Sequence, residues 1–109
     1  WLCWHGFPFK KFPSDFPLKS MVVLDLGYSS FEQVWEGTKC IGQLKILNLS
    51  HCRNLAKTPD FSGQPNINLE TLILNDCARL VEFHESIGNL EGLVFLNLKN
   101  CKNLRKLPK

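Results

Sequence analysis

Cysteine and histidine are the residue types in this chain that could do chemistry, because thiols and imidazoles bind metal ions and act as nucleophiles and bases. The 109 residues include 5 cysteines and 3 histidines. No C-x-x-C or H-x-x-x-H spacing occurs, and the neighbours His51 and Cys52 would point to opposite sides of a strand. The spacing therefore predicts no metal site and no cofactor.

The chain also lacks the motifs of common enzymes. No serine lies in a G-x-S-x-G motif, and no G-x-x-x-x-G-K-[ST] loop is present to cradle a phosphate. The histidines His5, His51 and His84 form no recognisable nucleophile–base set with the acidic residues. We therefore expect a binding protein and not an enzyme.

Charge and hydropathy argue against two classes of partner. The net charge of +3 is mild, whereas nucleic-acid binding usually requires a clustered basic face. The longest strongly apolar run, residues 21–24, is far shorter than the ~20 residues of a membrane span, and residues 1–11 hold no secretory signal. The sequence predicts neither a nucleic-acid nor a membrane partner.

Three of the cysteines occupy one position of a repeat. Each of these cysteines lies in a copy of the pattern L-x-x-L-x-L-x-x-C-x-x-L, which is the signature of a leucine-rich repeat. Counted from the first leucine as offset 0, the residues at offsets 0, 3, 5, 8 and 11 are Leu44, Leu47, Leu49, Cys52 and Leu55, then Leu69, Leu72, Leu74, Cys77 and Leu80, then Leu93, Leu96, Leu98, Cys101 and Leu104. Because one repeat cannot bury its apolar edge alone, stacked repeats share a continuous core.

Two looser repeats precede these three. Offsets 0, 3, 5 and 8 of one are Met21, Leu24, Leu26 and Ser29, and offsets 3, 5 and 8 of the other are Leu2, Trp4 and Phe7. We therefore expect one domain over residues 1–109, a leucine-rich-repeat fragment of about five repeats starting near 1, 21, 44, 69 and 93. The first repeat is expected to be incomplete at its N-terminus.

Each L-x-x-L-x-L core predicts a short strand in which offsets 3 and 5 point inward, because strand side chains alternate. Leu72 and Leu96 are thus expected in the core, with Leu55, Leu80 and Leu104 packed behind them. The predicted fold class is α/β: a leucine-rich-repeat solenoid, wound as a right-handed superhelix. Its short parallel strands form the concave face, and loops or short helical turns form the convex face.

The convex segments differ between repeats. Residues 58–66 contain two prolines and a glycine and predict a loop or a single turn. Residues 84–90 could form one turn of 3₁₀ or α-helix that buries Ile87 and Leu90. In the second repeat, the same role is expected for Phe31, Val34 and Trp35.

The repeat register accounts for the cysteines without disulfides. Cys52, Cys77 and Cys101 should stack in a column with the ~5 Å spacing of neighbouring strands. A thiol at this offset is small and hydrophobic, and its S–H group is a weak hydrogen-bond donor. It can therefore cap backbone groups of the turn from the inside of the fold. Cys3 and Cys40 lie outside the column. The odd total and the buried register predict reduced thiols in a reducing compartment.

Several motifs point to one family. W-x-G-x-P occurs at residues 4–8, E-Q-V-W-E-G at 32–37, T-P-D-F-S-G at 58–63 and L-I-L-N-D-C at 72–77. With these motifs the chain resembles, over essentially its whole length, the first leucine-rich repeats of plant intracellular immune receptors of the TIR-NBS-LRR class. Segment 64–69 departs from the family pattern, since it holds one residue more before the next leucine.

The resemblance implies a role and a location. Receptors of this class carry a TIR domain and a nucleotide-binding switch, and their repeat domain senses a pathogen effector and holds the switch inactive. The implied partners are a pathogen effector or host protein and the nucleotide-binding domain of the full receptor. The implied location is the cytoplasm, with the nucleus as a second location.

The repeat register predicts two surfaces. Strand residues that point outward form the concave face, where an apolar stripe could contact a protein partner, although such residues also simply favour strands. The candidate partner-binding residues on this face are Val23, Tyr28, Ile46, His51, Ile73, Asp76, Phe95 and Lys99. A basic edge follows the cysteine column and is either solvated or docked on an acidic surface. It comprises Arg53, Lys57, Arg79, Lys102, Arg105 and Lys106.

Two other functions stay open. Extracellular recognition domains of receptor-like proteins typically carry L-x-G-x-I-P after the turn, whereas residues 104–108 here read L-R-K-L-P and the turn uses cysteine instead of asparagine. The third possibility is a structural scaffold without a ligand.

Overall fold

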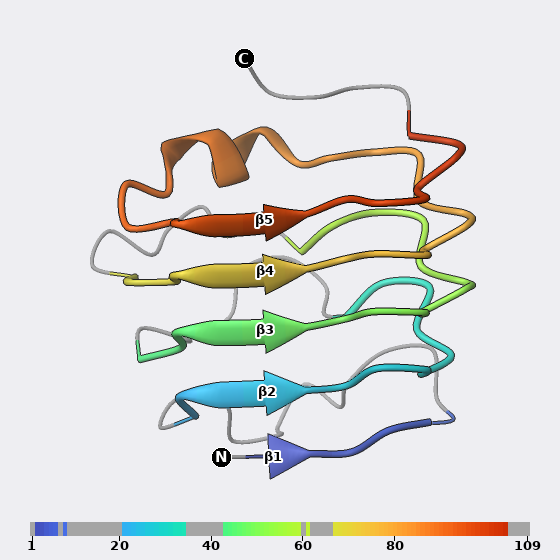
Figure 1. The fold of residues 1–109 in the computed structure, drawn as a ribbon, viewed down its shortest axis with the longest axis horizontal. Helices are drawn as coiled ribbons and strands as arrows, with labels where there is room; N and C mark the ends of the chain where they lie inside the picture. The colour runs from blue at the N-terminus through green and yellow to red at the C-terminus, as the bar shows by residue number, and fades with distance from the viewer. Residues whose placement is uncertain are drawn as a thin grey trace.

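Five short strands lie side by side in one parallel sheet, in the order of the sequence (Figure 1). The computed structural model describes residues 2–6, 8, 21–34, 43–59, 61 and 67–104. The strands are β1 (Leu2–Cys3), β2 (Val23–Asp25), β3 (Ile46–Asn48), β4 (Thr71–Ile73) and β5 (Phe95–Asn97). Between β4 and β5, where the structure describes the whole connection, the chain returns behind the sheet, and the parallel pairing of all five strands confirms the predicted solenoid of short parallel strands (Figure 1).

The register of the sheet stacks equivalent positions of neighbouring repeats. Leu24 pairs with Leu47, Leu47 with Leu72 and Leu72 with Leu96. The inward leucines at offsets 3 and 5 in the middle of the array are fully buried: Leu24, Leu26, Leu47, Leu49, Leu72 and Leu74. The predicted inward ladders are therefore confirmed for these repeats, because strand alternation directs both offsets to the same side.

The last strand behaves differently from the middle ones. Leu96 is 38% exposed and Leu98 is only partly buried. Within the described part of the chain, β5 pairs with β4 on one side and has no strand on the other. The prediction of a core position for Leu96 is thus wrong, because an inward direction buries a side chain only when a neighbour lies on both sides.

Apolar side chains of the returning segments complete the core. Phe31 and Val34 are fully buried as predicted, whereas Trp35 lies outside the described residues. Leu55 and Leu80 are also fully buried behind the strands, and Leu104 is partly buried.

The returning segment of the fourth repeat contains the predicted helical turn. A 3₁₀ helix, η1, spans Glu85–Asn89 and buries Ile87, while Leu90 is partly buried. The Nδ1 atom of His84 caps this helix by accepting a hydrogen bond of 3.0 Å from the backbone N–H of Ser86. The predicted single turn of 3₁₀ or α-helix within 84–90 is therefore confirmed, and the structure forms it as 3₁₀ over Glu85–Asn89.

The preceding returning segment holds η1 in place. The Thr58 hydroxyl accepts a 2.7 Å hydrogen bond from the His84 N–H, and the Ser86 hydroxyl accepts one of 2.9 Å from the Phe61 N–H. Residues 58, 59 and 61 are not helical, as predicted, and the remainder of the predicted loop, 60 and 62–66, lies outside the described residues.

The column of cysteines caps the strand ends from inside. The thiols of Cys52, Cys77 and Cys101 donate to the carbonyl oxygens of Leu26, Leu49 and Leu74 in the preceding repeats, at 3.4, 3.1 and 3.0 Å. Burial raises the pKa of Cys52 to about 11 and that of Cys77 to about 12, so both remain protonated donors at neutral pH. Cys3 and these three cysteines are free thiols, and Cys40 lies outside the described residues.

We expect the leucine ladder to tolerate truncation at its end better than in its middle. Leu72→Ala should lower the free energy of unfolding by about 2–5 kcal/mol, because it leaves a cavity in a closed core. Leu96→Ala should cost only about 1–2 kcal/mol, because part of its surface already faces solvent. Equilibrium unfolding in urea measures both, with the exposed Lys57→Ala as a control expected to cost less than ~0.5 kcal/mol. Equal losses for Leu72 and Leu96 would contradict the described burial.

Candidate protein-binding surface

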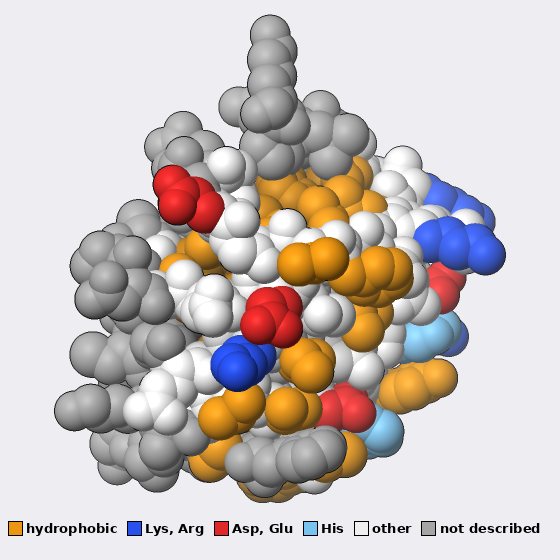
Figure 2. Space-filling model, turned by 60° about the vertical axis from the view of Figure 1, so that its left-hand side comes forward, with side chains coloured by type: hydrophobic (Ala, Val, Ile, Leu, Met, Phe, Trp, Pro, Cys, Tyr) orange, Lys and Arg blue, Asp and Glu red, His pale blue; other side chains and the backbone are white. Residues whose placement is uncertain are grey.

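The side of the sheet opposite the core, here called the strand face, carries the side chains at offsets 2 and 4. Among the described residues they are Cys3, Val23, Asp25, Ile46, Asn48, Thr71, Ile73, Phe95 and Asn97. Ile46 is 37% exposed and Phe95 is 51% exposed, whereas Val23 and Ile73 are half-buried between their neighbours. Hydrophobic side chains gather in a broken band on the molecular surface, with charged and histidine side chains beside it (Figure 2). The strand face therefore offers apolar contact area on a hydrogen-bonded sheet.

A second row of side chains follows the strands at offset 7 and is here called the turn column. It consists of Tyr28, His51, Asp76 and Asn100, whose φ angles are 63°, 58°, 62° and 64°. This left-handed conformation costs residues with a Cβ roughly 1–2 kcal/mol each. The cost is offset because these residues continue the ladder between repeats. The backbone N–H groups of Tyr28, His51 and Asp76 donate to carbonyl oxygens of the next repeat at 2.8–2.9 Å.

The side chains of the turn column contact one another from repeat to repeat. The rings of Tyr28 and His51 stack with centroids 4.6 Å apart and planes inclined by 4°. His51 Nε2 lies 3.5 Å from Asp76 Oδ2, and the Asn100 amide donates to Asp76 Oδ1 at 2.9 Å. Hydrogen bonds from Asn100 and Asn75 lower the pKa of Asp76, and the charges of His51 and Lys99 lower it further. Asp76 is therefore a carboxylate at neutral pH, and Tyr28, 62% exposed, presents the main aromatic surface of the column.

The structure places seven of the eight predicted concave residues in these two rows. Val23, Ile46, Ile73 and Phe95 belong to the strand face, and Tyr28, His51 and Asp76 belong to the turn column. Lys99 is exposed beside the column, where its backbone carbonyl accepts the Asp76 N–H. The left-handed turn was not predicted, because no glycine marks offset 7 in the last four repeats.

The basic edge is less uniform than the sequence indicated. Arg53, Arg79 and Lys102 are exposed, but Lys57 Nζ lies 4.0 Å from Glu82 Oε2, so its charge has a partner. Arg105 and Lys106 lie outside the described residues. Arg79 also lines a groove of about 460 Å³ together with Glu32, Asn54, Ala56, Val81 and Asn103.

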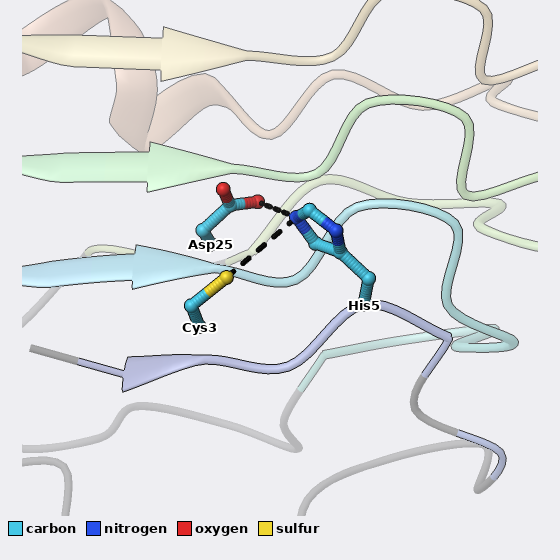
Figure 3. Close-up of side chains that lie close together, drawn as sticks. All are labelled: Cys3, His5 and Asp25. Carbon is cyan, nitrogen blue, oxygen red and sulfur yellow. Dashed lines mark hydrogen bonds and ion pairs between the residues drawn. The ribbon is translucent and has the colours of Figure 1, made fainter.

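Sequence reasoning missed a cluster of three metal-ligand types at the first two repeats. His5 Nε2 lies 2.9 Å from Asp25 Oδ1 and 3.8 Å from the thiol of Cys3 (Figure 3). No short ligand spacing along the chain reveals this cluster, because Asp25 lies 20 residues beyond His5. The repeat register carried the signal, since Cys3 and Asp25 share offset 4 and pair between β1 and β2.

A matched pair of substitutions tests the strained turn. His51→Asn and His51→Val both remove the ring that stacks on Tyr28, but only valine is strongly disfavoured at positive φ. We expect the valine variant to unfold with a free energy about 1–2 kcal/mol lower than the asparagine variant in urea. Equal stabilities would show that residue 51 does not hold a left-handed turn in solution.

Among the described residues, no helix is long and apolar enough to span a lipid bilayer.

Comparisons with known proteins agree with this architecture. A model of the family described as Leucine Rich Repeat matches residues 43–64. The chain is 39% identical over 103 residues to TMV resistance protein N of Nicotiana glutinosa. This match covers 94% of the chain and 9% of that protein. It is 41% identical over 107 residues to Protein SUPPRESSOR OF npr1-1, CONSTITUTIVE 1 of Arabidopsis thaliana, covering 98% of the chain and 7% of that protein.

A third relative comes from another plant. Disease resistance protein RPV1 of Vitis rotundifolia is 38% identical over 91 residues, which is 84% of the chain and 6% of that protein. The chain thus spans less than a tenth of the length of these curated relatives. The similarity confirms the resemblance to plant disease resistance proteins that the motifs indicated. The chain is a leucine-rich-repeat solenoid, and over most of its length it is similar to plant disease resistance proteins of the TIR-NBS-LRR class.

Proposed function

We propose that this chain is the protein-recognition part of a plant immune receptor and that its strand face and turn column together bind a protein partner. The observation that carries the proposal is the exposure of Ile46, Phe95 and Tyr28 on one side of a sheet. The similarity to plant disease resistance proteins supports the biological setting.

The residue composition of this surface is more typical of a protein interface than of a surface that contacts only solvent. Aromatic residues dominate the binding energy of protein interfaces, and among the described residues Phe95 and Tyr28 are the most exposed aromatic side chains on this side. Because the backbone of both rows is hydrogen-bonded between repeats, little conformational entropy is lost on binding. The polar pair His51 and Asp76 supplies hydrogen-bonding groups beside the apolar band.

The family resemblance suggests the nature of the partner. We infer that the surface senses a pathogen effector or a host protein, in the cytoplasm or the nucleus. An intracellular setting agrees with the four described cysteines, which are all free thiols.

The basic edge suits a second, intramolecular contact. Arg53, Arg79 and Lys102 are exposed cations on turns that follow the cysteine column. Exposed charges give a contact that is specific but readily released. We infer that this edge docks on the nucleotide-binding domain of the full receptor and holds it in the resting state.

The first test concerns recognition by a full-length receptor that carries these repeats. Combined alanine substitutions at Tyr28, Ile46 and Phe95 should reduce the effector-triggered cell-death response in leaves at least about tenfold, as expected when several interface anchors are lost. The side chains are exposed, so the protein should accumulate normally on an immunoblot. Val81→Ala, an apolar truncation on the returning segments, is the matched control. A normal response from the triple variant would contradict the proposed binding surface.

The second test concerns autoinhibition. Reversing Arg53, Arg79 and Lys102 to glutamate should cause leaf cell death without a pathogen, because like charges would then oppose docking. Lys45→Glu serves as the control, since Lys45 is an exposed cation that precedes β3 and is not part of the basic edge. If resting activity stays flat in the triple reversal, the docking role is wrong and the edge is simply solvated.

A further inference from the structure

We propose that Cys3, His5 and Asp25 form a surface site for Zn²⁺ that joins the first repeat to the second. Thiolate sulfur, imidazole nitrogen and carboxylate oxygen are the three ligand types that zinc uses in proteins. Their ligand atoms all lie within 4.8 Å of one another, although Asp25 comes from the second repeat and the other two residues from the first (Figure 3). Among the residues that the structure describes, this is the one such group of three.

The sheet register places these side chains together. Cys3 and Asp25 are paired residues of β1 and β2, and strand alternation directs both to the strand face. Hydrogen bonds from the N–H of Trp4 to the Asp25 carbonyl (2.8 Å) and from the N–H of Gly6 to the Gly27 carbonyl (3.0 Å) extend the ladder past β1. These two bonds flank His5 and fix the backbone from which its ring reaches Cys3 and Asp25.

The same three positions recur along the array but hold different residue types. Each set consists of offsets 4 and 6 of one repeat and offset 4 of the next. The corresponding sets are Asp25, Gly27 and Asn48; Asn48, Ser50 and Ile73; and Ile73, Asn75 and Asn97. None combines a thiol, an imidazole and a carboxylate. The geometry is therefore general to the fold, whereas the ligand chemistry belongs to the first two repeats alone.

The contacts fit convergent ligation better than a catalytic relay. In a nucleophile–base–acid triad, the nucleophile and the acid contact opposite nitrogens of the imidazole ring. Here the Cys3 thiol and the Asp25 carboxylate both face Nε2 of His5. A single Nε2–H cannot be shared equally by both neighbours, whereas a cation at their meeting point would accept a lone pair from all three atoms.

Zinc binding requires the three ligand atoms, which lie within 4.8 Å of one another, to adopt one common range of separations. Zinc bond lengths of about 2.0–2.3 Å in tetrahedral geometry place ligand atoms about 3.3–3.7 Å apart. The Cys3–His5 separation of 3.8 Å is already close to that range, and the His5–Asp25 separation of 2.9 Å must widen slightly. The thiol releases its proton to solvent on binding, and the imidazole keeps its proton on Nδ1 so that Nε2 coordinates the ion.

Exposure decides the character of the site. Cys3 and His5 are exposed and Asp25 is half-buried, so three protein ligands leave a fourth position open to water or to a side chain of a partner. The sulfur and nitrogen ligands favour Zn²⁺ over Mg²⁺ or Ca²⁺. Because Cys3 lies in β1 and Asp25 lies in β2, the ion would also stabilise the attachment of β1, which has only two residues, to the sheet.

Cobalt provides the direct test, because Co²⁺ occupies zinc sites and a thiolate ligand gives it a charge-transfer absorption band. Titration of the reduced chain with Co²⁺ should produce this band with one equivalent, and Zn²⁺ should abolish it by displacement. Cys3→Ser should eliminate the band, and His5→Gln and Asp25→Asn should each weaken binding about tenfold or more. Glu70→Gln and Glu91→Gln are the controls, since they alter exposed carboxylates outside this cluster and should leave the affinity unchanged.

Thiol labelling gives an independent readout on the unmodified protein. Saturating Zn²⁺ should slow iodoacetamide labelling of Cys3 at least about tenfold, as expected when the thiolate is coordinated, and EDTA should restore the rate. The rate at Cys101, read by peptide mass mapping, should not change. A cobalt band that survives Cys3→Ser, no band at all, or labelling of Cys3 that ignores Zn²⁺ would overturn the proposal.

Discussion

Every repeat of this chain depends on its neighbours for hydrogen-bond partners and for the other half of its core. The strands are only two or three residues long, so none could persist alone. Stacking in parallel register satisfies their backbone groups and places Leu24, Leu47 and Leu72 in one buried row. Leu96 illustrates the same dependence. It points inward, but only one neighbouring strand covers it, and its side chain stays accessible to solvent.

The register also determines where the backbone is strained and how the strain is compensated. Left-handed residues such as Tyr28 and His51 turn the chain at the same offset in successive repeats. One position later, Cys52 and Cys77 point inward and donate to carbonyl groups of the preceding repeat. The turn thus costs conformational energy at one residue, and the hydrogen bonds of the ladder and of the buried thiols offset it.

Because the fold repeats, function resides in what differs between equivalent positions. Offset 2 holds exposed apolar residues such as Ile46 and Phe95, which suit a protein partner. Offset 4 is carried by Cys3 and Asp25 in the first two repeats, where His5 completes a set of metal ligands, and by Asn48 or Ile73 further along. The proposed protein-binding surface and the proposed zinc site therefore share one face of the sheet and leave its core unchanged.

The sequence by itself determined the fold and the direction of most side chains. Leucines at offsets 3 and 5 require strands that share a core, so the burial of Leu49 and Leu74 followed from spacing alone. The placement of Ile46 and Phe95 outside the core followed from the same alternation. The helical turn over Glu85–Asn89 was also predictable from the apolar Ile87 within a polar segment.

Only the tertiary structure decided which side chains meet. The Tyr28–His51 stack, the Lys57–Glu82 pair and the His5–Asp25 contact join residues that are 23, 25 and 20 positions apart. Such contacts depend on the distance between stacked turns and on the rotamer of each side chain, and neither quantity is encoded in a local pattern. Spacing along one chain therefore identified columns of residues, whereas the packing of one repeat on the next established the contacts within them.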